Sequence, residues 1–347
     1  MNTTPKATLQ KGRFKSVFTA VGMTAVAILT LAGCASTASD SKAAVADSGI
    51  NIAVVGGMTS DTFFSVVKNG VDAAGKAVEA AGGKVTYLPL KNYDNLGPDA
   101  ADLVRNAIAL KVSAIAVPNW VAEAEDGAIK DAVAAGIKVW IYNAGGLASA
   151  DKTGGKMYIG SDEYKAGVAG GEYFGQNGAK NILCINTAPG AVNIEQRCDG
   201  VADGAGKNGA KSKQLPLPSS SFGDASAVAQ AIKGALVKDP TIDGVITIGA
   251  ADADAAASGI EQAGLTDKVK LGTFDMSESV LTRIKDGTQL FAIDQQGFLQ
   301  GYMAVSMAWL GSQYAIQPAT REFLTGPSLV TSENVEQVLA GVTAGAR

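Results

Sequence analysis

The feature that most constrains the fold is an alternation of short β-branched runs with alanine-rich stretches, which begins near residue 50. The apolar runs have the length of buried strands, and the stretches between them have the length of helices. Strands of this kind, separated by helices, indicate parallel sheets with both faces covered. The runs predict strands at 50–55, 84–90, 114–117, 138–142, 156–160, 181–185, 244–248 and 270–273.

The segments between these strands predict helices, several of which are followed by glycine. Glycine at a helix end adopts the left-handed conformation without steric cost, so the Ala-Gly pairs at 135–136 and 263–264 mark helix ends. The predicted helices include 63–81, 99–109, 123–134, 166–176, 225–236 and 253–262.

The alternation starts afresh about halfway along the chain. One series runs from 50 to 142, and a similar one runs from 156 to about 273. Because parallel strands present their ligand loops at their carboxyl ends, two facing halves would enclose a cleft. The sequence therefore predicts an α/β protein with two doubly wound parallel-sheet lobes, joined by a hinge, and a ligand cleft between them.

The first residues have the pattern of an export signal. A basic head that includes Lys11 and Arg13 precedes an apolar run at 17–31. The run ends in Leu31-Ala32-Gly33-Cys34, which resembles the lipobox of bacterial lipoproteins. The resemblance implies a signal peptide at 1–33, lipid on Cys34 and an extracytoplasmic, lipid-anchored protein. An uncleaved anchor is the alternative, but the run is shorter than the roughly 20 residues that span a bilayer.

The next segment, 34–48, has small and polar side chains with nothing to bury, which is typical of a flexible tether. The formal net charge of the chain is −4, and part of its basic charge lies in the head. An acidic surface argues against a nucleic-acid partner. We expect a monomer whose only membrane attachment is the lipid.

The chain contains no histidine, which excludes Ser-His and Cys-His nucleophile pairs and His-ligated zinc. We expect neither a metal nor a cofactor. Apart from Cys34, the cysteines are Cys184 and Cys198. In an oxidising compartment this pair forms either a disulfide or two buried thiols, and geometry decides between them.

The loop after the first strand, 56–64, carries an aspartate beside two phenylalanines. A dinucleotide site would need a glycine where Asp61 stands, so a Rossmann cofactor site is not expected. Asp61 either caps the following helix or faces a ligand. Phe63 and Phe64 are both candidates to pack on a ligand, and one of the two is expected in the core. This opening resembles that of the periplasmic sugar-binding proteins of ABC importers, of the ribose/galactose type.

The resemblance extends over nearly all of 50–347 and implies the type I periplasmic-binding-protein fold. It implies a first lobe of 50–145 plus 296–322 and a second lobe of 146–295 plus 323–347. Asn143 matches a polar position of the ligand loop after the fourth strand. At the next position the family usually has an arginine that contacts the sugar, but the chain has Ala144. The resemblance therefore does not indicate one specific sugar.

Further ligand residues follow from the resemblance in the second half. Arg197 aligns with a ligand arginine, with a surface ion pair to Asp199 or Glu195 as the alternative. Asp252 matches an aspartate after a strand, with an N-cap as the alternative, and Ala251 stands where asparagine is usual. The remaining residues expected to contact the ligand are Asp275, Gln295, Phe222 and, from loop position alone, Trp120.

Carboxylates and amides of this kind bind hydroxyls, and aromatic rings pack on the apolar faces of a sugar. The resemblance therefore implies a solute-binding protein without enzymatic activity, which delivers a monosaccharide or small polyol to the permease subunits of an ABC importer. Ala144 and Ala251 favour a ligand other than ribose, such as a sugar alcohol or an inositol.

Three other functions are alternatives to this one. A sugar sensor for a membrane chemoreceptor or kinase would have the same fold. A repressor of this fold lacks support, because the chain has an export signal and no DNA-binding head. A glycosidase would use a carboxylate pair, either Asp252 with Asp254 or Asp61 with Asp275.

Overall fold

The computed structural model describes residues 49–347 and contains two six-stranded sheets. In the first sheet the strand order is β11-β5-β4-β3-β1-β2, with every neighbouring pair parallel. Its strands are β1 (Asn51–Gly56), β2 (Lys84–Pro89), β3 (Ala114–Val117), β4 (Lys138–Tyr142), β5 (Tyr158–Ser161) and β11 (Glu322–Gly326).

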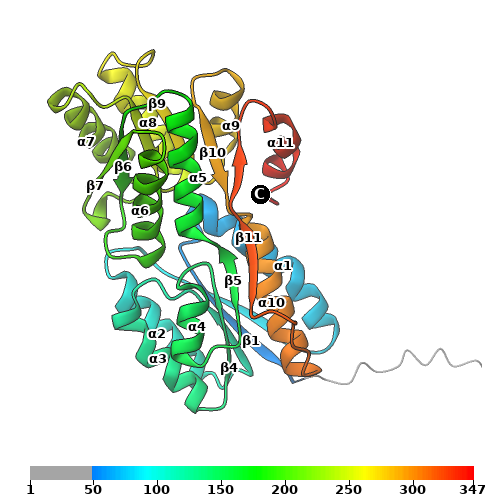
Figure 1. The fold of residues 1–347 in the computed structure, drawn as a ribbon. Coiled ribbons are helices and arrows are strands. Elements are labelled where there is room, and N and C mark those ends of the chain that lie inside the picture. The colour runs from blue at the N-terminus through cyan, green and yellow to red at the C-terminus, as the bar shows by residue number, and fades with distance from the viewer. Residues whose placement is uncertain (1–48) are drawn as a thin grey trace, which may run out of the picture. The chain divides into compact units, whose positions relative to one another are not determined.

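The second sheet repeats this order as β12-β10-β9-β8-β6-β7. Only its edge strand β12 is antiparallel to its neighbour. Its strands are β6 (Asn181–Asn186), β7 (Lys211–Pro216), β8 (Gly244–Thr247), β9 (Lys270–Phe274), β10 (Phe291–Asp294) and β12 (Ser328–Val330). The two doubly wound lobes that the sequence predicts are thus confirmed (Figure 1).

Helices cover both faces of the first sheet. Along β1, Ile52 and Val54 pack towards α1 and α10, whereas Ala53 and Val55 pack towards α2 and α3. This alternation explains why the strand is apolar throughout. The helices of this first lobe are α1 (Thr62–Ala80), α2 (Leu96–Ala109), α3 (Ala122–Ala134), α4 (Gly146–Thr153) and α10 (Gly297–Gln313).

The second lobe is built in the same way. Along β6, Ile182 and Cys184 face α5 and α6, while Leu183 and Ile185 face α7 and α8. Its helices are α5 (Glu163–Gln176), α6 (Val192–Gly206), α7 (Ala225–Lys238), α8 (Ala250–Gln262), α9 (Glu278–Lys285), α11 (Val335–Thr343) and the short 3-10 helix Ser219–Ser221.

Three crossovers connect the lobes: β5 to α5, β10 to α10, and β11 to β12 (Figure 1). They correct the predicted boundaries. The segment at 156–160 was expected to open the second series, but β5 pairs with β4 inside the first sheet. The second lobe therefore begins after Ser161, not at 146. Likewise β11 extends the returning segment of the first lobe to Gly326, beyond the predicted 322.

Helices α5 and α6 pack with their backbones in direct contact. A Cβ atom added at Gly167 would lie 2.2 Å from the carbonyl oxygen of Arg197, and one at Gly200 would lie 2.2 Å from that of Tyr164. Both distances are far below a normal van der Waals contact. Only glycine therefore fits at these two positions.

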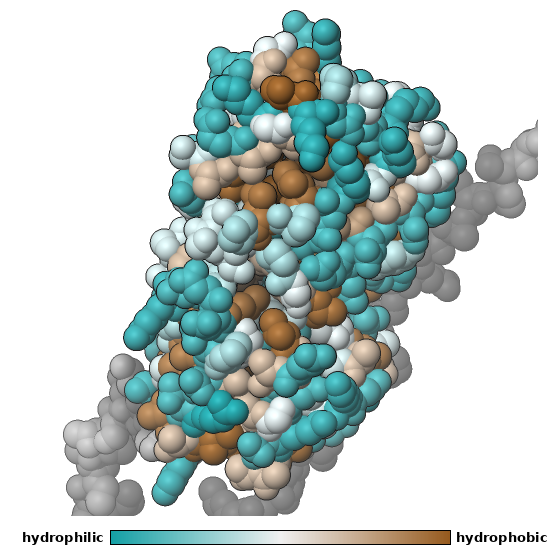
Figure 2. Space-filling view, turned by 90° about the vertical axis from the view of Figure 1, so that its left-hand side faces the viewer, coloured by the Kyte–Doolittle hydropathy of each residue, from teal (hydrophilic) through white to brown (hydrophobic). Residues whose placement is uncertain are grey.

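Cys184 on β6 and Cys198 on α6 form a disulfide, which resolves the alternative that the sequence left open. The predicted signal peptide, Cys34 and the tether lie outside the described residues. Within residues 49–347 no helix is long and apolar enough to span a bilayer. The face shown in Figure 2 is mostly hydrophilic, with hydrophobic residues in several separate patches.

Candidate functional site

A cavity of about 350 Å³ lies between the lobes, at the carboxyl ends of the strands. Its size is at the lower end of the roughly 300–1,000 Å³ typical of small-molecule sites. The structure brings together at this cavity every residue that the sequence proposed for ligand binding: Asp61, Phe63, Phe64, Trp120 and Asn143 from the first lobe, and Arg197, Phe222, Asp252, Asp275 and Gln295 from the second lobe and its crossover.

Asp61 has both of the roles considered for it. It is the N-cap of α1, where its Oδ1 accepts a hydrogen bond from the backbone N–H of Phe63 at 2.8 Å. Its other oxygen, Oδ2, accepts from the Tyr93 hydroxyl at 2.6 Å. Burial raises the pKa of this carboxyl, and the bond from Tyr93 opposes that effect. Because Oδ1 also accepts from the Phe64 N–H at 3.5 Å, Oδ2 is the oxygen that keeps a lone pair with which to accept from a ligand.

Aromatic rings form the apolar part of the cavity. The ring of Phe64 meets Trp120 edge-on at 5.8 Å, and Phe63 meets Phe64 at 5.2 Å. Phe64 is the buried ring of the two, as expected, and Phe63 is half-buried. From the second lobe Phe222 contacts Tyr93 of the first lobe, with 4.4 Å between ring centroids.

Asn143 follows β4 and has a left-handed backbone, with φ of 62°. Its Oδ1 accepts from the Trp120 indole N–H at 3.2 Å, and its Nδ2 donates to Gln300 Oε1 at 3.2 Å. The amide is thus held in a fixed orientation at the cavity wall, and one N–H remains for a ligand.

Arg197 is buried, and its guanidinium is held by three protein acceptors. Its Nε donates to Glu163 Oε2 at 2.6 Å, one terminal nitrogen donates to the Ile248 carbonyl at 2.7 Å, and the other to Gln295 Oε1 at 2.6 Å. The guanidinium also lies 4.5 Å from the ring centre of Phe274. The alternative of a surface ion pair with Asp199 or Glu195 is wrong, because the partner is the buried Glu163.

Asp252 lies in the first turn of α8, and the N-cap of that helix is Gly249, so the alternative N-cap role is wrong. Its Oδ2 accepts from the Thr187 hydroxyl at 2.8 Å. Burial raises its pKa to about 6. Asp254, the partner in one glycosidase hypothesis, instead pairs with Arg283 at 2.7 Å, and its side chain is half-exposed. The carboxylate pair Asp252 with Asp254 is therefore absent from the cavity wall.

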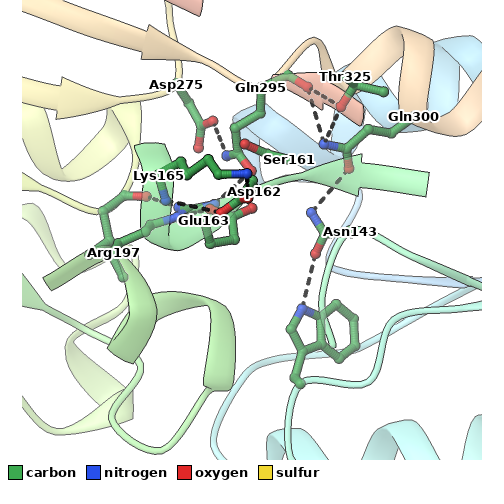
Figure 3. A network of polar contacts seen from close by, with 12 residues as sticks. Asn143, Ser161, Asp162, Glu163, Lys165, Arg197, Asp275, Gln295, Gln300 and Thr325 are labelled. Carbon is green, nitrogen blue, oxygen red and sulfur yellow. Dashed lines mark hydrogen bonds and ion pairs between the residues drawn. The ribbon is translucent and has the colours of Figure 1, made fainter. Parts of the chain in front are cut away.

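Asp275 follows β9, again with a left-handed backbone, and accepts a hydrogen bond from Gln295 Nε2. Burial raises the pKa of Asp275 to about 7, while the charge of Arg197 and the bond from Gln295 oppose the rise. Because Gln295 also accepts from Arg197, these three residues form one continuous hydrogen-bonded chain (Figure 3).

The same network reaches the crossovers, as Figure 3 shows. Gln300 Nε2 donates to the Gln295 carbonyl at 3.1 Å and to the Thr325 hydroxyl at 3.2 Å. Thr325 in turn donates to the Gln295 carbonyl at 2.8 Å. Since Gln300 also holds Asn143, polar groups at the cavity are connected to two of the three segments between the lobes.

The lobes also touch each other directly in this structure. The backbone N–H of Val192 donates to the Trp120 carbonyl at 2.9 Å. Leu96 from the first lobe packs against the apolar cluster that contains Ile194 and Ile248 of the second. With the contact between Tyr93 and Phe222, these interactions close the cleft over the cavity.

The sequence reasoning missed several lining residues, chiefly Tyr93, Leu96 and Asn193. Tyr93 lies in the loop after β2, so an aromatic residue at the end of a predicted strand was the available signal. Asn193 is buried, and its Oδ1 has no hydrogen-bond partner among the described residues. Such an unpaired acceptor beside a cavity is suited to a ligand hydroxyl.

Comparison with known proteins agrees with this architecture. The sequence profile of the family described as periplasmic binding protein domain matches residues 52–311. Among solved structures, the chain is similar to a carbohydrate transporter from Acidothermus cellulolyticus 11B in complex with myo-inositol. The two are 33% identical with a TM-score of 0.78, and the match covers 86% of this chain and 99% of that one.

Two further relatives are more distant. GanP, a glucose-galactose binding protein from Geobacillus stearothermophilus, shares the fold, with 20% identity, a TM-score of 0.72, and coverage of 82% of this chain and 98% of that one. The curated xylose/arabinose-binding protein XylF of Sulfolobus acidocaldarius is 26% identical over 275 residues, or 72% of this chain. The chain spans 65% of the length of that relative. From the profile match and the two-lobed fold around one cavity, the chain belongs to the periplasmic binding protein family, with the type I fold of the sugar-binding proteins of ABC importers.

Proposed function

We propose that this protein captures a monosaccharide or small polyol outside the cytoplasm and delivers it to the permease of an ABC importer. The observation that carries the proposal is the composition of the cavity wall. Asp61, Asp252 and Asp275 are carboxylates with oxygens available to a ligand, and aromatic rings lie beside them. Adjacent hydroxyls of a polyol donate to such oxygens, and the C–H faces of its ring pack on aromatic side chains.

Both lobes contribute to the cavity, so a ligand would contact both when the cleft is closed. A ligand that binds the closed form more tightly shifts the population towards it, and hinge closure of this kind reorients two lobes about their connecting segments. The closed protein would then present one defined surface to the permease. Lipidation of Cys34 would keep the protein at the membrane that carries this permease.

The family relationship supports a binding role without catalysis. Among the candidate ligands, a carbocyclic polyol deserves the first test, because the relative from Acidothermus is in complex with myo-inositol. The chain has alanine at positions 144 and 251, where the family usually has an arginine and an asparagine. The absence of these two side chains favours a ligand other than ribose.

The proposal is tested by a thermal-shift screen of the purified protein against aldoses, alditols, inositols, nucleosides and amino acids, followed by calorimetric titration of each hit. At a ligand concentration of about 100 times Kd, binding stabilises the folded protein by roughly 2.7 kcal/mol. A sugar or polyol should give this response and be recovered chemically unchanged. A response confined to nucleosides or amino acids, or turnover of a glycoside, would contradict the proposal.

A further inference from the structure

The charged groups at the cavity are strongly unbalanced. Three carboxylates, those of Asp61, Asp252 and Asp275, line it, and Arg197 is the single cationic side chain among the described lining residues. Charges in a water-poor site interact more strongly than they do in bulk solvent. The electrostatic potential that a ligand experiences in the cavity therefore depends on how much of the positive charge of Arg197 is already balanced by neighbouring groups.

Glu163 balances the charge of Arg197 from outside the cavity lining. It is the first residue of α5, directly after the crossover from β5, and it is not among the residues that line the cavity. Its Oε2 is 2.6 Å from Arg197 Nε, and the two side chains are only 2% and 3% exposed. Its second oxygen has no hydrogen-bond partner among the described residues, so the carboxylate is directed at Arg197 alone.

The remaining contacts of Arg197 fix its guanidinium group at the cavity wall. Its two terminal nitrogens already donate to Ile248 and Gln295, so the guanidinium is fixed in place with two N–H groups left over. Burial disfavours its charge, yet Glu163 and Asp275 raise the pKa of Arg197, which keeps it protonated. Arg197 can thus donate hydrogen bonds to a ligand while its positive charge is matched by Glu163.

We propose that the cleft accepts uncharged polyols and rejects their anionic analogues, and that Glu163 sets this specificity by neutralising Arg197. This inference rests on the function proposed above and narrows its ligand class. An anionic group in the cavity would face three carboxylates without a free counter-charge, and such a like-charge arrangement opposes binding. A hydroxyl group meets no such penalty. Selection of this kind acts by repelling the wrong ligand.

A structural role for Glu163, as an anchor of the arginine side chain, predicts something different. Loss of an anchor would weaken the binding of all ligands alike. Loss of a neutralising charge would change the ratio of affinities between anionic and neutral ligands. This ratio is the quantity to measure.

The test uses neutral and anionic probes of matched shape in calorimetric titrations at pH 8. One set is D-glucose, D-glucuronamide and D-glucuronate, in which the amide controls for the shape of the carboxylate. A second set is myo-inositol, a mono-O-methyl-inositol and myo-inositol 1-phosphate. For the set whose neutral member binds, we expect the anion to bind at least about 100-fold more weakly than that member.

The variant Glu163→Gln keeps the shape and a hydrogen-bonding oxygen but removes the charge. We expect this variant to lower the ratio of the anion's Kd to the neutral probe's Kd by about tenfold or more. A tenfold change in this ratio corresponds to about 1.4 kcal/mol. The matched control is Glu172→Gln on the same helix, where the carboxylate pairs with Lys207 and both side chains are more exposed. The control should leave the ratio unchanged.

The outcomes separate the two proposals. An anion that binds the native protein as tightly as its neutral parent would overturn the charge selection and leave the solute-binding function intact. An unchanged ratio in Glu163→Gln, with all affinities lowered together, would assign Glu163 a structural role and overturn its part in specificity. If neither parent binds but the thermal-shift screen finds another sugar or polyol, the same comparison is made with that ligand and its anionic analogue. If the screen finds no neutral sugar or polyol, the proposed function fails, and the inference that rests on it fails too.

Discussion

Asn143 and Asp275 occupy equivalent positions in the two lobes. Each follows the strand that lies third in its sheet, β4 or β9, and their φ values are 62° and 63°. The backbone N–H of each donates to an isoleucine carbonyl on the next strand, Ile159 or Ile293, at 2.9 Å. The repeated fold thus places one polar side chain from each lobe at the same cavity, on a left-handed backbone that Asn and Asp tolerate better than most residues.

The first prediction concerns Asp275→Asn. Asparagine tolerates the same backbone and can still accept from Gln295, so the free energy of unfolding at pH 8 should not fall. Binding should weaken by about 10- to 100-fold, because a hydrogen bond to a charged acceptor contributes about 1.5–3 kcal/mol. Calorimetric titration and chemical unfolding measure the two quantities. The control is Asp254→Asn on the exposed part of α8. This variant should leave the ligand affinity and the free energy of unfolding close to those of the native protein. Equal affinity in native protein and Asp275→Asn would contradict the role of this carboxylate.

The second prediction concerns pH. The pKa values of Asp252 and Asp275 are raised to about 6 and about 7 in the folded protein, by burial. Between pH 4 and 7 the folded protein therefore holds protons that the unfolded chain has released, so the free energy of unfolding of the ligand-free protein should fall as pH rises through this range. The chain has no histidine to titrate in this range, but burial also raises the pKa values of Asp61, Glu125, Glu163 and Asp294, and these carboxyls add to the same fall.

This pH dependence is measured by urea unfolding at several pH values from 5 to 8. The double variant Asp252→Asn with Asp275→Asn should have a flatter profile than the native protein. A profile of equal slope in both would show that other groups carry the effect.

The third prediction concerns the disulfide. Cys184 and Cys198 are 14 positions apart, and a crosslink that closes a loop of this size stabilises a protein by about 3 kcal/mol in the chain-entropy description. Replacing both cysteines by alanine should lower the free energy of unfolding by this amount. Ligand affinity should fall less than tenfold, because contacts with α5 and with Glu163 still hold α6 and Arg197. A large loss of affinity in a variant of unchanged stability would show that the crosslink mainly orients the arginine.

The fourth prediction concerns the contact between the lobes. Phe222→Ala removes the ring that meets Tyr93, a contact of a type that contributes about 0.5–1.5 kcal/mol beyond buried area. Ligand affinity should fall by about tenfold, mainly through faster dissociation, as is usual for interface changes. Tyr93→Phe is the matched variant, since it keeps the ring contact and loses only the hydroxyl, which donates to Asp61 and accepts from the Met58 backbone N–H. Stopped-flow dissociation of the two variants should differ. Identical rates would argue that the ring contact does not hold the cleft closed.

Much of the fold could be predicted, because strands buried on both faces produce apolar runs that stand out in a sequence. Strands β3 and β4 begin and end at the expected residues. The pattern failed where burial is incomplete. Strand β7 is an edge strand with mostly exposed side chains, including two lysines, so its sequence has no apolar run.

The predicted boundary between the lobes was wrong for a different reason. Strand β5 has the same apolar character as the strands of either sheet, and only its pairing with β4 and β11 assigns it to the first. Pairing between segments more than 160 residues apart in the chain, as for Tyr158 and Glu322, leaves no local signal.

The lining residues could be predicted where a resemblance supplied a motif at the end of a strand. Glu163 could not, because its importance arises from the approach of α5 to α6, and the predicted helices include 166–176 but none over 192–206. Its pairing with Arg197 spans 34 positions and depends on how α5 packs on α6.

That packing has a consequence for how the protein can change over evolutionary time. The carbonyl oxygen of Arg197 is the atom that a Cβ atom at Gly167 would strike, so α5 and α6 keep this close packing only while residue 167 is glycine. New ligand preferences can therefore arise by substitution in the loop between β2 and α2, which contributes Tyr93 and, at the start of α2, Leu96. A larger residue at Gly167 or Gly200, in contrast, would push the two helices apart and so disturb the buried ion pair between them.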